Sequence, residues 1–326
     1  MSRIQKQIIS AQPGRDLQYA GIDVSKNQLD AYIHPQGVAL AVPNDASGFE
    51  KISKWFSAKG VIHIVMEATG KYHRKAHESL HAQGFAVTVL NPYRSRRFAQ
   101  ALGELAKTDK IDATVLARFA SMVQPKSTPP SPKALQDLKE LAAARRQVTA
   151  DMTALKNQIT QAEHDLVLDQ MNQRLTLLQN HQTVLDQEIY RQIMADAFLA
   201  NQFQILTSIP SVGTVCATTI IADLGEIGTI NASEIATLAG VAPMNRDSGT
   251  WRGTRSIYGG RHTVRKSLYM TALLATQGKG PFASFYKRLI GLGKKPKVAL
   301  TAVMRKLIIL ANTLIKENRS WSTIAP

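Results

Sequence analysis

A proline-rich stretch near the middle of the chain sets the strongest limit on how it can fold. Residues 124–132 read Gln-Pro-Lys-Ser-Thr-Pro-Pro-Ser-Pro. Proline has no backbone N–H and a fixed φ, so neither a helix nor an inner strand can run through this stretch. We therefore predict a linker at 125–133 and a boundary between folded units there. With 326 residues and 44% apolar content, the chain can bury a core in each of two or three units.

The segment before the linker, residues 16–124, has the pattern of an α/β domain and follows a basic tail at 1–15. Alternating apolar residues predict a meander of three strands, after which helices and strands alternate. The expected order is β-β-β-α-β-α-β-α, which suits a mixed sheet flanked by helices with active groups at the strand ends. The strands are expected at 17–24, 29–33, 38–42, 61–66 and 85–90.

The segment after the linker is predicted to be mainly helical. Between residues 134 and 200 apolar residues recur at spacings of three and four, with Arg145 at one of these positions and a break in phase before Met171. This pattern predicts a long coiled coil, either an antiparallel hairpin within one chain or a dimerising pair between two chains. Residues 201–326 contain further helical runs, and we predict a mainly α-helical domain there.

The charge of the chain predicts a polyanionic partner, for which nucleic acid is the natural candidate. Lysine and arginine exceed the acidic residues enough to give a formal net charge of +16. The single cysteine, Cys216, excludes an internal disulfide and a cysteine-rich zinc site, which indicates a reducing cytosol. We expect neither a signal peptide nor a membrane span, because Arg305 and Lys306 interrupt the most apolar C-terminal segment.

Four acidic residues lie where such a sheet delivers side chains into a cleft. Asp23 stands at the end of the first predicted strand, and Glu67 directly follows the fourth. Asp109 and Asp112 are three residues apart, so they share one face if that segment is helical. Two magnesium ions would neutralise the cluster and hold the attacking and leaving oxygens of a phosphodiester. Alternatively, Asp109 only favours a helix N-terminus, and Asp23 and Glu67 are turn residues.

The last part of the chain carries charge of one sign. Between Ser248 and Lys316 there is no Asp or Glu, although Lys and Arg are frequent. Ordinary solvated faces mix both signs, so we expect this part to bind phosphates. The residues expected to contact nucleic acid are Arg246, Arg252, Arg255, Arg261, Arg265, Lys266, Lys294 and Lys295.

Two segments of this basic region suggest more specific roles. Residues 209–217 resemble a helix-hairpin-helix, whose turn offers backbone N–H groups to a phosphate, although Ser211 stands where that motif usually has glycine and a plain turn is the alternative. Ser248 lies among glycines and arginines, which could enclose a scissile phosphate and stabilise a serine alkoxide. Nearby, Trp251 either stacks on a base or packs beneath the loop.

The histidines are expected to be structural. His63 lies inside an apolar strand and is expected to be a satisfied core residue. His73, His77 and His81 recur at helical spacing and could form a metal-binding face. We expect a solvated helix surface there instead, because no suitable additional ligand is evident.

Taken in order, the motifs resemble two groups of DNA enzymes. The strand-end Asp and Glu followed by a helical Asp-x-x-Asp resemble the RuvC family of junction resolvases, which are RNase H-like nucleases. The full set of motifs is Gly21-Ile22-Asp23-Val24-Ser25-Lys26, Glu67-Ala68-Thr69-Gly70, Lys107-Thr108-Asp109-Lys110-Ile111-Asp112, Leu238–Pro243 with Ser248-Gly249, and Gly260-Arg261 with Arg265-Lys266-Ser267-Leu268-Tyr269. This set resembles the DEDD insertion-sequence transposases related to Piv invertases, over nearly the entire chain.

The resemblance to the DEDD transposases implies a Mg²⁺-dependent recombinase of a prokaryotic insertion sequence, acting in the cytoplasm at the nucleoid. It implies a RuvC-like catalytic domain at 16–124 and a serine-bearing transposase domain at 201–326, with Ser248 forming a phosphoserine link to DNA. The implied partners are double-stranded donor and target DNA, a structured bridge RNA, and further copies of the chain in a homodimer or homotetramer. The implied metal ligands, which with Ser248 would be the catalytic residues, are Asp23, Glu67, Asp109 and Asp112.

Two rival functions stay open at this point. A RuvC-like endonuclease would hydrolyse Holliday junctions with metal-activated water, form no covalent intermediate and leave Ser248 structural. A non-enzymatic scaffold that binds RNA or DNA would use the acids only as helix caps and turns. For the scaffold, removal of metal or of Asp23 would leave every activity unchanged.

Overall fold

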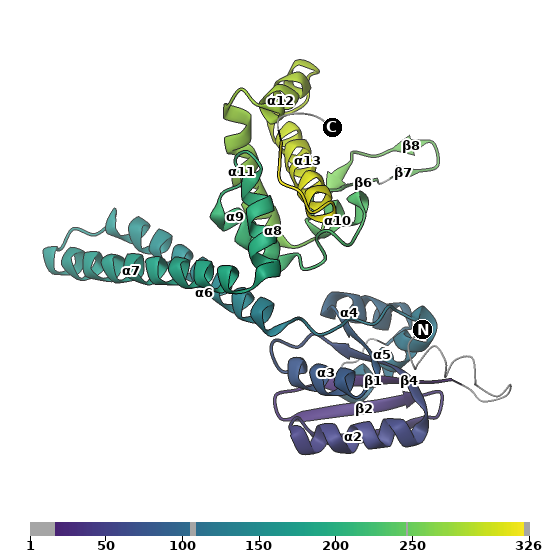
Figure 1. Cartoon of the computed structure of the whole chain (residues 1–326). Helices are drawn as coiled ribbons and strands as arrows, with labels where there is room; N and C mark the ends of the chain where they lie inside the picture. Colours follow the sequence, from purple (N-terminus) through teal and green to yellow (C-terminus); the bar gives the residue numbers. More distant parts are fainter. Residues whose placement is uncertain (1–16, 105–108, 246, 323–326) are drawn as a thin grey trace. The chain divides into compact units, whose positions relative to one another are not determined.

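The computed structural model describes residues 17–104, 109–245 and 247–322, and only the backbone of Asp109, Lys110 and Arg252. The chain divides into two compact units, Met1–Ser131 and Pro132–Pro326 (Figure 1). The first unit holds the sheet, and the second holds the long helices that follow the proline-rich segment.

The first unit is built on a five-stranded mixed sheet in the order β3-β2-β1-β4-β5. The first three strands form an antiparallel meander, whereas β4 pairs in parallel with β1 and β5 pairs in parallel with β4. The predicted α/β fold and its order of strands and helices are confirmed. The strands are β1 (Gln18–Val24), β2 (Gln28–His34), β3 (Val38–Pro43), β4 (Val61–Glu67) and β5 (Ala86–Leu90).

Helices cover both faces of this sheet. On one face α2 (Ala46–Lys59) and α3 (His73–Ala82) pack over a core that includes Ile22, Met66 and Phe56. On the other face α4 (Pro92–Ala101) and α5 (Asp109–Val123) pack over a second core that includes Tyr19, Val65 and Phe119. Each strand side chain therefore belongs to one of two environments, because successive residues point to opposite faces.

The proline-rich segment packs against the sheet of the first unit through hydrogen bonds to β5. The Thr128 N–H donates to Val87 O at 2.7 Å, and the Thr88 hydroxyl donates to Lys126 O at 2.8 Å. The Ser127 hydroxyl also donates to Val87 O at 3.1 Å. Residues 126–128 therefore cover the outer edge of β5, which would otherwise present unpaired backbone groups to other chains.

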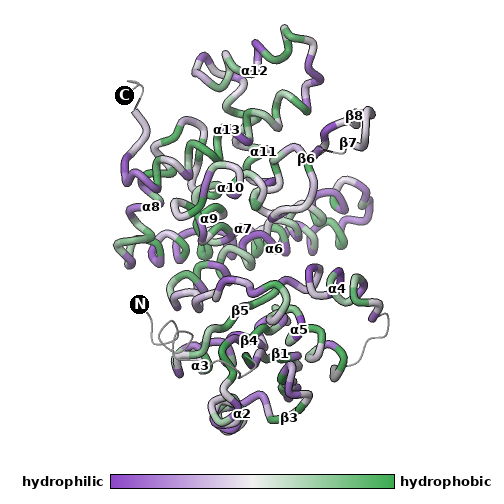
Figure 2. The backbone as a smooth tube through the Cα atoms, turned by 90° about the vertical axis from the view of Figure 1, so that its right-hand side faces the viewer, coloured by the Kyte–Doolittle hydropathy of each residue, from purple (hydrophilic) through white to green (hydrophobic). Residues whose placement is uncertain are grey.

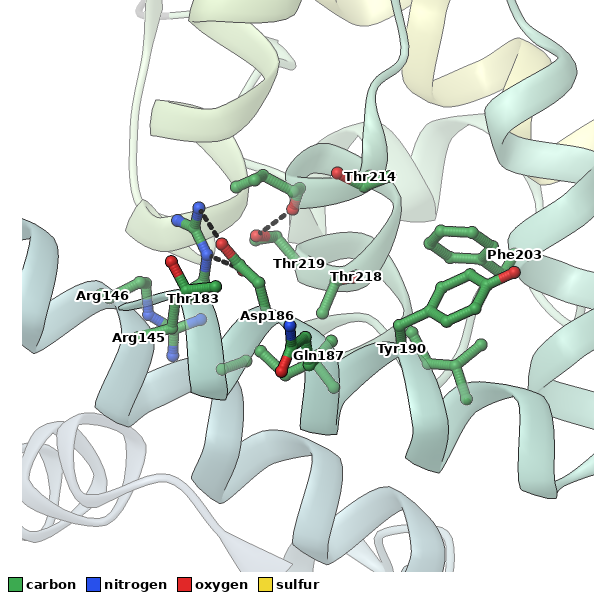
Figure 3. Close-up of a pocket in the computed structure, with 14 residues that line it drawn as sticks. Arg145, Arg146, Thr183, Asp186, Gln187, Tyr190, Phe203, Thr214, Thr218 and Thr219 are labelled. Atoms are coloured by element: carbon green, nitrogen blue, oxygen red, sulfur yellow. Dashed lines mark hydrogen bonds and ion pairs between the residues drawn. The ribbon is translucent and has the colours of Figure 1, made fainter. Parts of the chain in front are cut away.

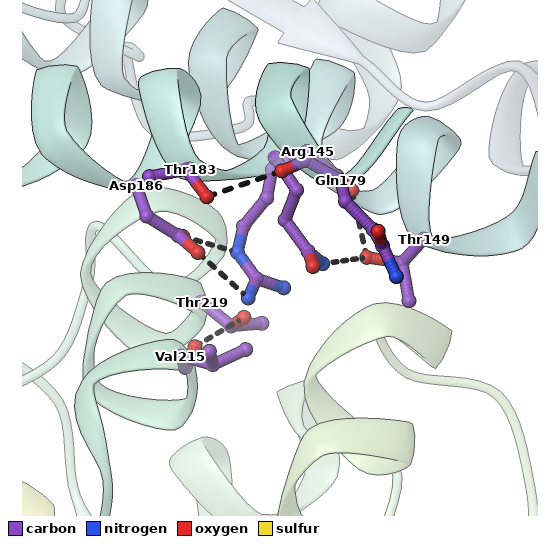
Figure 4. Close-up of polar contacts among 8 residues, drawn as sticks. Arg145, Thr149, Gln179, Thr183, Asp186, Val215 and Thr219 are labelled. Atoms are coloured by element: carbon purple, nitrogen blue, oxygen red, sulfur yellow. Dashed lines mark hydrogen bonds and ion pairs between the residues drawn. The ribbon is translucent and has the colours of Figure 1, made fainter. Parts of the chain in front are cut away.

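The second unit begins with a helical hairpin. α6 (Lys133–Ile159) and α7 (Asp165–Ala195) lie side by side in opposite directions, so the pairing is within one chain (Figure 1). Figure 2 shows that both hydrophilic and hydrophobic residues occur in this part of the chain. Arg145 occupies an inward position because Asp186 pairs with it across the hairpin, with Nε 2.5 Å from the carboxylate, and Gln182 donates to the Thr149 hydroxyl nearby (Figure 4).

Six further helices form most of the rest of the described second unit around one core, which confirms the mainly helical prediction. α13 is long and apolar enough to cross a membrane by length and composition. Its side chains Val303, Leu307 and Ala311 are buried in this core, however, so it serves as a core helix. The helices are α8 (Ala197–Ser208), α9 (Thr214–Asp223), α10 (Ala232–Leu238), α11 (His262–Gln277), α12 (Pro281–Gly291) and α13 (Pro296–Lys316).

Candidate functional site

Asp23 and Glu67 lie side by side at the ends of neighbouring parallel strands. The register between β1 and β4 pairs Ile22 with Met66, and each acid follows one of these residues. Ile22 and Met66 are both buried in the core beneath α2 and α3. Since side chains alternate along a strand, both acids point to the opposite face, where α4 and α5 pack. Both are partly exposed, as side chains that meet a ligand must be.

Helix α5 directs its first turn toward this same edge. At one point α5 crosses β1 so closely that a Cβ on Gly21 would lie 2.1 Å from Ala113 O. At the other end of the crossing, the Gln124 side chain donates to the Tyr19 hydroxyl at 3.2 Å. α5 therefore runs antiparallel to β1, and its first turn, which carries Asp109 and Asp112, points toward the strand ends.

The structure brings the elements of the four acids to one edge but does not show them joined in a metal site. Within the described side chains, no group of three or more His, Cys, Asp or Glu residues is close enough to hold a metal ion. The side chain of Asp109 lies outside the described part. The donors are all carboxylate oxygens, which fits Mg²⁺ better than a softer ion.

Glu67 has a partner that the sequence did not reveal. The Ser95 hydroxyl on α4 lies 2.6 Å from Glu67 Oε2 and 3.0 Å from Pro92 O, and Ser95 is buried. A hydroxyl has one hydrogen, and the shorter, charge-assisted contact to the carboxylate takes it. Ser95 thereby orients the carboxylate and leaves Oε1 available to a cation.

Ser248 lies on a small hairpin of the second unit. β7 (Asp247–Ser248) pairs antiparallel with β8 (Trp251–Arg252), and Ser248 lies directly opposite Trp251. Below them β6 (Pro243–Met244) pairs with β9 (Ser256–Ile257). Both Ser248 and Trp251 are exposed, with Trp251 at 62%, so the tryptophan does not pack beneath the loop. The hairpin presents hydroxyl and indole on one face.

The basic residues expected to bind nucleic acid fall into two groups. Arg261 forms two hydrogen bonds of 2.5 Å to Glu226. Burial alone would raise the pKa of Glu226, but the hydrogen bonds and charge of Arg261 lower it more, so the pKa lies below its ordinary value. Arg265 donates to Gly259 O at 2.6 Å. Both guanidinium groups therefore support the loop at the base of the hairpin. Arg255, Lys266, Lys294 and Lys295 are exposed, whereas Arg246 and the Arg252 side chain lie outside the described residues.

The turn between α8 and α9 matches the backbone that a glycine would adopt. Ser211 has a φ of 72°, the left-handed conformation that glycine adopts most readily. Gly213 caps α9 without a side-chain hydrogen bond. Serine at position 211 therefore adopts the turn that a glycine would form there, and its backbone is strained as a result.

The histidines of α3 are less exposed than predicted. His77 is buried, and its Nε2 lies 2.7 Å from Thr128 O in the proline-rich segment, so the prediction of a solvated surface is wrong for it. Burial lowers the pKa of His77 and of His73. His63 is hydrogen-bonded as predicted but is only half-buried: the hydrogen of the Thr88 hydroxyl goes to Lys126 O, so His63 Nε2, 2.8 Å away, is the donor to Thr88.

A pocket of about 440 Å³ lies in the second unit between the helical hairpin and α9 (Figure 3). The rings of Tyr190 and Phe203 form its apolar end, and Arg145 with Asp186 forms its polar end. None of the acids proposed as metal ligands lines it, and neither does Ser248. Cys216 is buried nearby in the core, and burial raises the pKa of its thiol, so it is an inert packing residue.

Comparison with known proteins shows the family of this chain. Residues 20–173 match a family model of DEDD transposases of the IS110 type, and residues 203–287 match the model described as "Transposase IS116/IS110/IS902 family". The chain belongs to the IS110 family of transposases. It is thus a DNA transposase or recombinase.

Several relatives of this IS110-family chain have been named. It is 28% identical over 316 residues to the pilin gene-inverting protein of Moraxella bovis, and the match covers 93% of this chain and 97% of that protein. The pilin gene-inverting protein of Moraxella lacunata matches to the same extent. An uncharacterised 44.8 kDa protein of insertion element IS116 from Streptomyces clavuligerus is 28% identical over 145 residues, 43% of this chain and 35% of that protein.

Proposed function

We propose that this IS110-family transposase is a Mg²⁺-dependent site-specific recombinase that cleaves and rejoins DNA through a phosphoserine intermediate. The observation that carries the proposal is the placement of Asp23 and Glu67 at adjacent parallel strand ends, on the face toward which the first turn of α5 is directed. The metal ligands would be Asp23, Glu67, Asp109 and Asp112.

The sheet supports an RNase H-like, RuvC-like fold for the first unit. A meander of three antiparallel strands is joined through its first strand to two parallel strands, and the acids end the first and fourth strands. In an open α/β sheet, ligands bind where the carboxyl ends of parallel strands meet. The order of elements therefore suits a nuclease centre at this edge, and Mg²⁺ bound there would polarise a phosphodiester and stabilise a departing oxygen.

Ser248 would carry the covalent step. Its hydroxyl oxygen would attack the scissile phosphorus, forming a Ser248 Oγ–P bond while the P–O bond to one deoxyribose breaks. The hydroxyl proton would pass to solvent, and the departing sugar oxygen would take up a proton. A sugar hydroxyl of another strand would then attack the same phosphorus and release Ser248, so that the energy of the phosphodiester is retained. Exposure of Ser248 on a hairpin fits access to a DNA backbone.

The partners would be donor and target duplex DNA, a bridge RNA and further copies of this chain. Exposed Arg255, Lys266, Lys294 and Lys295 are available to phosphates. The helical hairpin of α6 and α7 occupies the segment in which the sequence predicts a coiled coil. Its outer surface would determine how copies of the chain pair in a dimer or tetramer. The family and the charge of +16 favour a cytoplasmic protein that works at the nucleoid.

Covalent trapping tests the proposal. Purified protein, Mg²⁺, the element's non-coding RNA and labelled donor and target DNA are incubated, and the products are separated on a denaturing gel. We expect a protein–DNA adduct that both Ser248→Ala and Asp23→Asn abolish. Cleavage without an adduct that is unaffected by Ser248→Ala would show a hydrolytic nuclease and overturn the serine mechanism.

A further inference from the structure

Helix α4 presents a basic face beside the carboxylate edge that is not used by the proposed reaction. It begins directly after β5, with the Asn91 side chain accepting from Tyr93 N at 2.8 Å. Ser95 turns inward to Glu67, and Ala99 is also buried. The residues that point outward are Tyr93, Arg94, Arg96, Arg97 and Gln100. The sequence of this helix contains no acid.

Aromatic rings hold two of these arginines away from the carboxylates. The Arg97 guanidinium lies 5.2 Å from the centre of the Tyr93 ring, and its Nε donates to the Tyr93 hydroxyl at 3.1 Å. The Arg94 guanidinium lies 5.7 Å from the centre of the Phe119 ring. Within the described residues neither arginine takes part in an ion pair with an acid. Arg97 Nη1 also donates to Gln100 Oε1 at 3.3 Å, a long contact that a phosphate oxygen can replace, and a guanidinium over a ring still points its remaining N–H groups outward.

The arginines of a basic helix next to a metal site can pair with the metal ligands, and the contacts of Arg94 and Arg97 avoid such pairing. An arginine paired with Glu67 would neutralise it and compete with a cation. Here Ser95 occupies one Glu67 oxygen, and Arg94, its neighbour in the chain, leans on Phe119 instead. The positive charge of α4 therefore lies on the helix next to Glu67 but does not neutralise that carboxylate. The α4 N-terminus adds its own partial positive charge.

We propose that the outward face of α4, centred on Arg94 and Arg97, binds the backbone of the DNA strand whose phosphate enters the carboxylate edge. The proposal rests on the proposed function, since DNA is chosen over RNA because this face adjoins Glu67. Two forked guanidinium groups would contact two phosphates. Tyr93, 54% exposed and braced by Arg97, adds a ring on which an unpaired base can stack.

Salt-dependent binding tests this surface without any cleavage. Labelled duplex DNA from the element's end is titrated with the full chain in EDTA at several salt concentrations, and anisotropy is recorded. The variant is Arg94→Gln with Arg97→Gln. The matched control is Lys51→Gln with Lys54→Gln, which removes equal charge from exposed positions on α2, on the other face of the sheet. Each lost phosphate contact lowers the slope of log K against log salt by about 0.9, so we expect a fall of about 1.8 against the control.

Further arms keep the outcome decisive. Arg94→Lys with Arg97→Lys keeps the charge and should restore most of the slope, which shows that the slope depends on the charge at these two positions. Methylphosphonate substitutions along the strand should weaken binding of the wild type, but not of the glutamine variant, at one or two adjacent phosphates. A slope equal to that of the control, or a fall seen only with the element's RNA, would overturn the proposal. Binding in EDTA needs no covalent step, so a wild-type chain that shows this difference in slope but forms no adduct would count against the serine mechanism alone.

Discussion

The hydroxyl of Ser95 lies 2.6 Å from Glu67 Oε2, and the neighbouring parallel strand β1 carries Asp23 as its last residue but one. Ser95 is 6% exposed, so water does not compete for this contact. The serine sits on α4 and the glutamate on β4, which means that one hydrogen bond fixes both the helix and the carboxylate. Ser95 is therefore a positioning residue for the proposed metal site.

Replacement of this serine should weaken metal binding more than it weakens the fold. In Ser95→Ala the carboxylate can rotate, and loss of an outer partner of a metal ligand typically costs 10- to 100-fold in affinity. We expect the Mg²⁺ concentration for half-maximal cleavage to rise by about that factor. Calorimetric titration with Mn²⁺ should show the same shift in the absence of DNA. Ser57→Ala, at an exposed position on α2, is the control and should leave both values unchanged.

Gly21 is required where α5 crosses β1. A Cβ there would lie 2.1 Å from Ala113 O and 2.4 Å from Ala117 N, and both are backbone atoms of a helix that cannot give way locally. Gly21→Ala should therefore destabilise the first unit by about 3 kcal/mol or more, as forced overpacking does at its upper end. Urea unfolding measures the loss. Gly291→Ala, where a Cβ meets nothing within 4 Å, should not destabilise the chain, and equal losses would contradict this account.

Ser211 is strained, and glycine should relieve the strain. An L-residue in the left-handed region costs about 1 to 2 kcal/mol, from which the greater flexibility of glycine in the unfolded chain subtracts about 0.4 to 1 kcal/mol. Ser211→Gly should therefore raise the free energy of unfolding by roughly 0.5 to 1 kcal/mol, measured by urea titration. Ser233→Gly, within the helix α10, should lower it instead. A loss in both variants would show that the Ser211 side chain stabilises the turn.

Burial of His77 should make the first unit sensitive to mild acid, although its hydrogen bond to Thr128 O opposes the effect. Burial lowers the pKa of His77 below its ordinary value of 6.5, so the folded state holds the neutral form where the unfolded chain already binds a proton. The stabilisation is complete above pH 6.5 and falls as the pH drops below it toward the folded-state pKa. His63 and His73 shift in the same direction for the same reason.

Thermal unfolding at pH 7.5 and 5.5 measures this dependence. The wild type should lose stability between the two, and His77→Gln, which cannot take up a proton, should lose less. His81→Gln is the control, because its side chain is more exposed than that of His77. An equal loss in His77→Gln and the wild type would assign the acid sensitivity to other groups.

Features that depend on local pattern could be predicted from the sequence. The order of strands and helices along the chain follows from alternating apolar residues and turn signals, and these also place Asp23 and Glu67 near the ends of strands. The mainly helical second unit follows from apolar spacing. The change of phase before Met171 predicts a break between two long helices, and the structure has that break earlier, between Ile159 and Asp165.

Features that depend on distant partners could not be predicted. Ser95 contacts an acid 28 residues earlier, and Arg261 pairs with Glu226 across 35 residues. His77 is covered by a segment 51 residues away, so its helical spacing alone suggested a solvated face. Arg94, Arg96 and Arg97 around Ser95 can be read from the sequence. Their relation to the acids follows only from the contact between α4 and Glu67, which the sequence does not show.

Trp251 should contact the DNA that Ser248 attacks. The two residues are directly opposite on β7 and β8, so their side chains project from one face with Cβ atoms about 4.5 to 5.5 Å apart. A base next to the scissile phosphate can therefore stack on the exposed indole, and such stacking contributes about 1 to 3 kcal/mol per base. Trp251→Ala should weaken binding of single-stranded or nicked DNA by about 5- to 150-fold, whereas Trp251→Phe should retain much of it.

Fluorescence reports this contact directly. In a chain with Trp55→Phe and Trp321→Phe, Trp251 is the remaining tryptophan, and addition of single-stranded DNA should quench its emission. The same quenching should occur with Ser248→Ala, because stacking needs no covalent step. Emission that stays constant while anisotropy shows DNA bound would place the strand elsewhere. In that case the hairpin would have to deliver Ser248 to the phosphate without holding the neighbouring base, and Trp251→Ala would leave adduct formation unchanged.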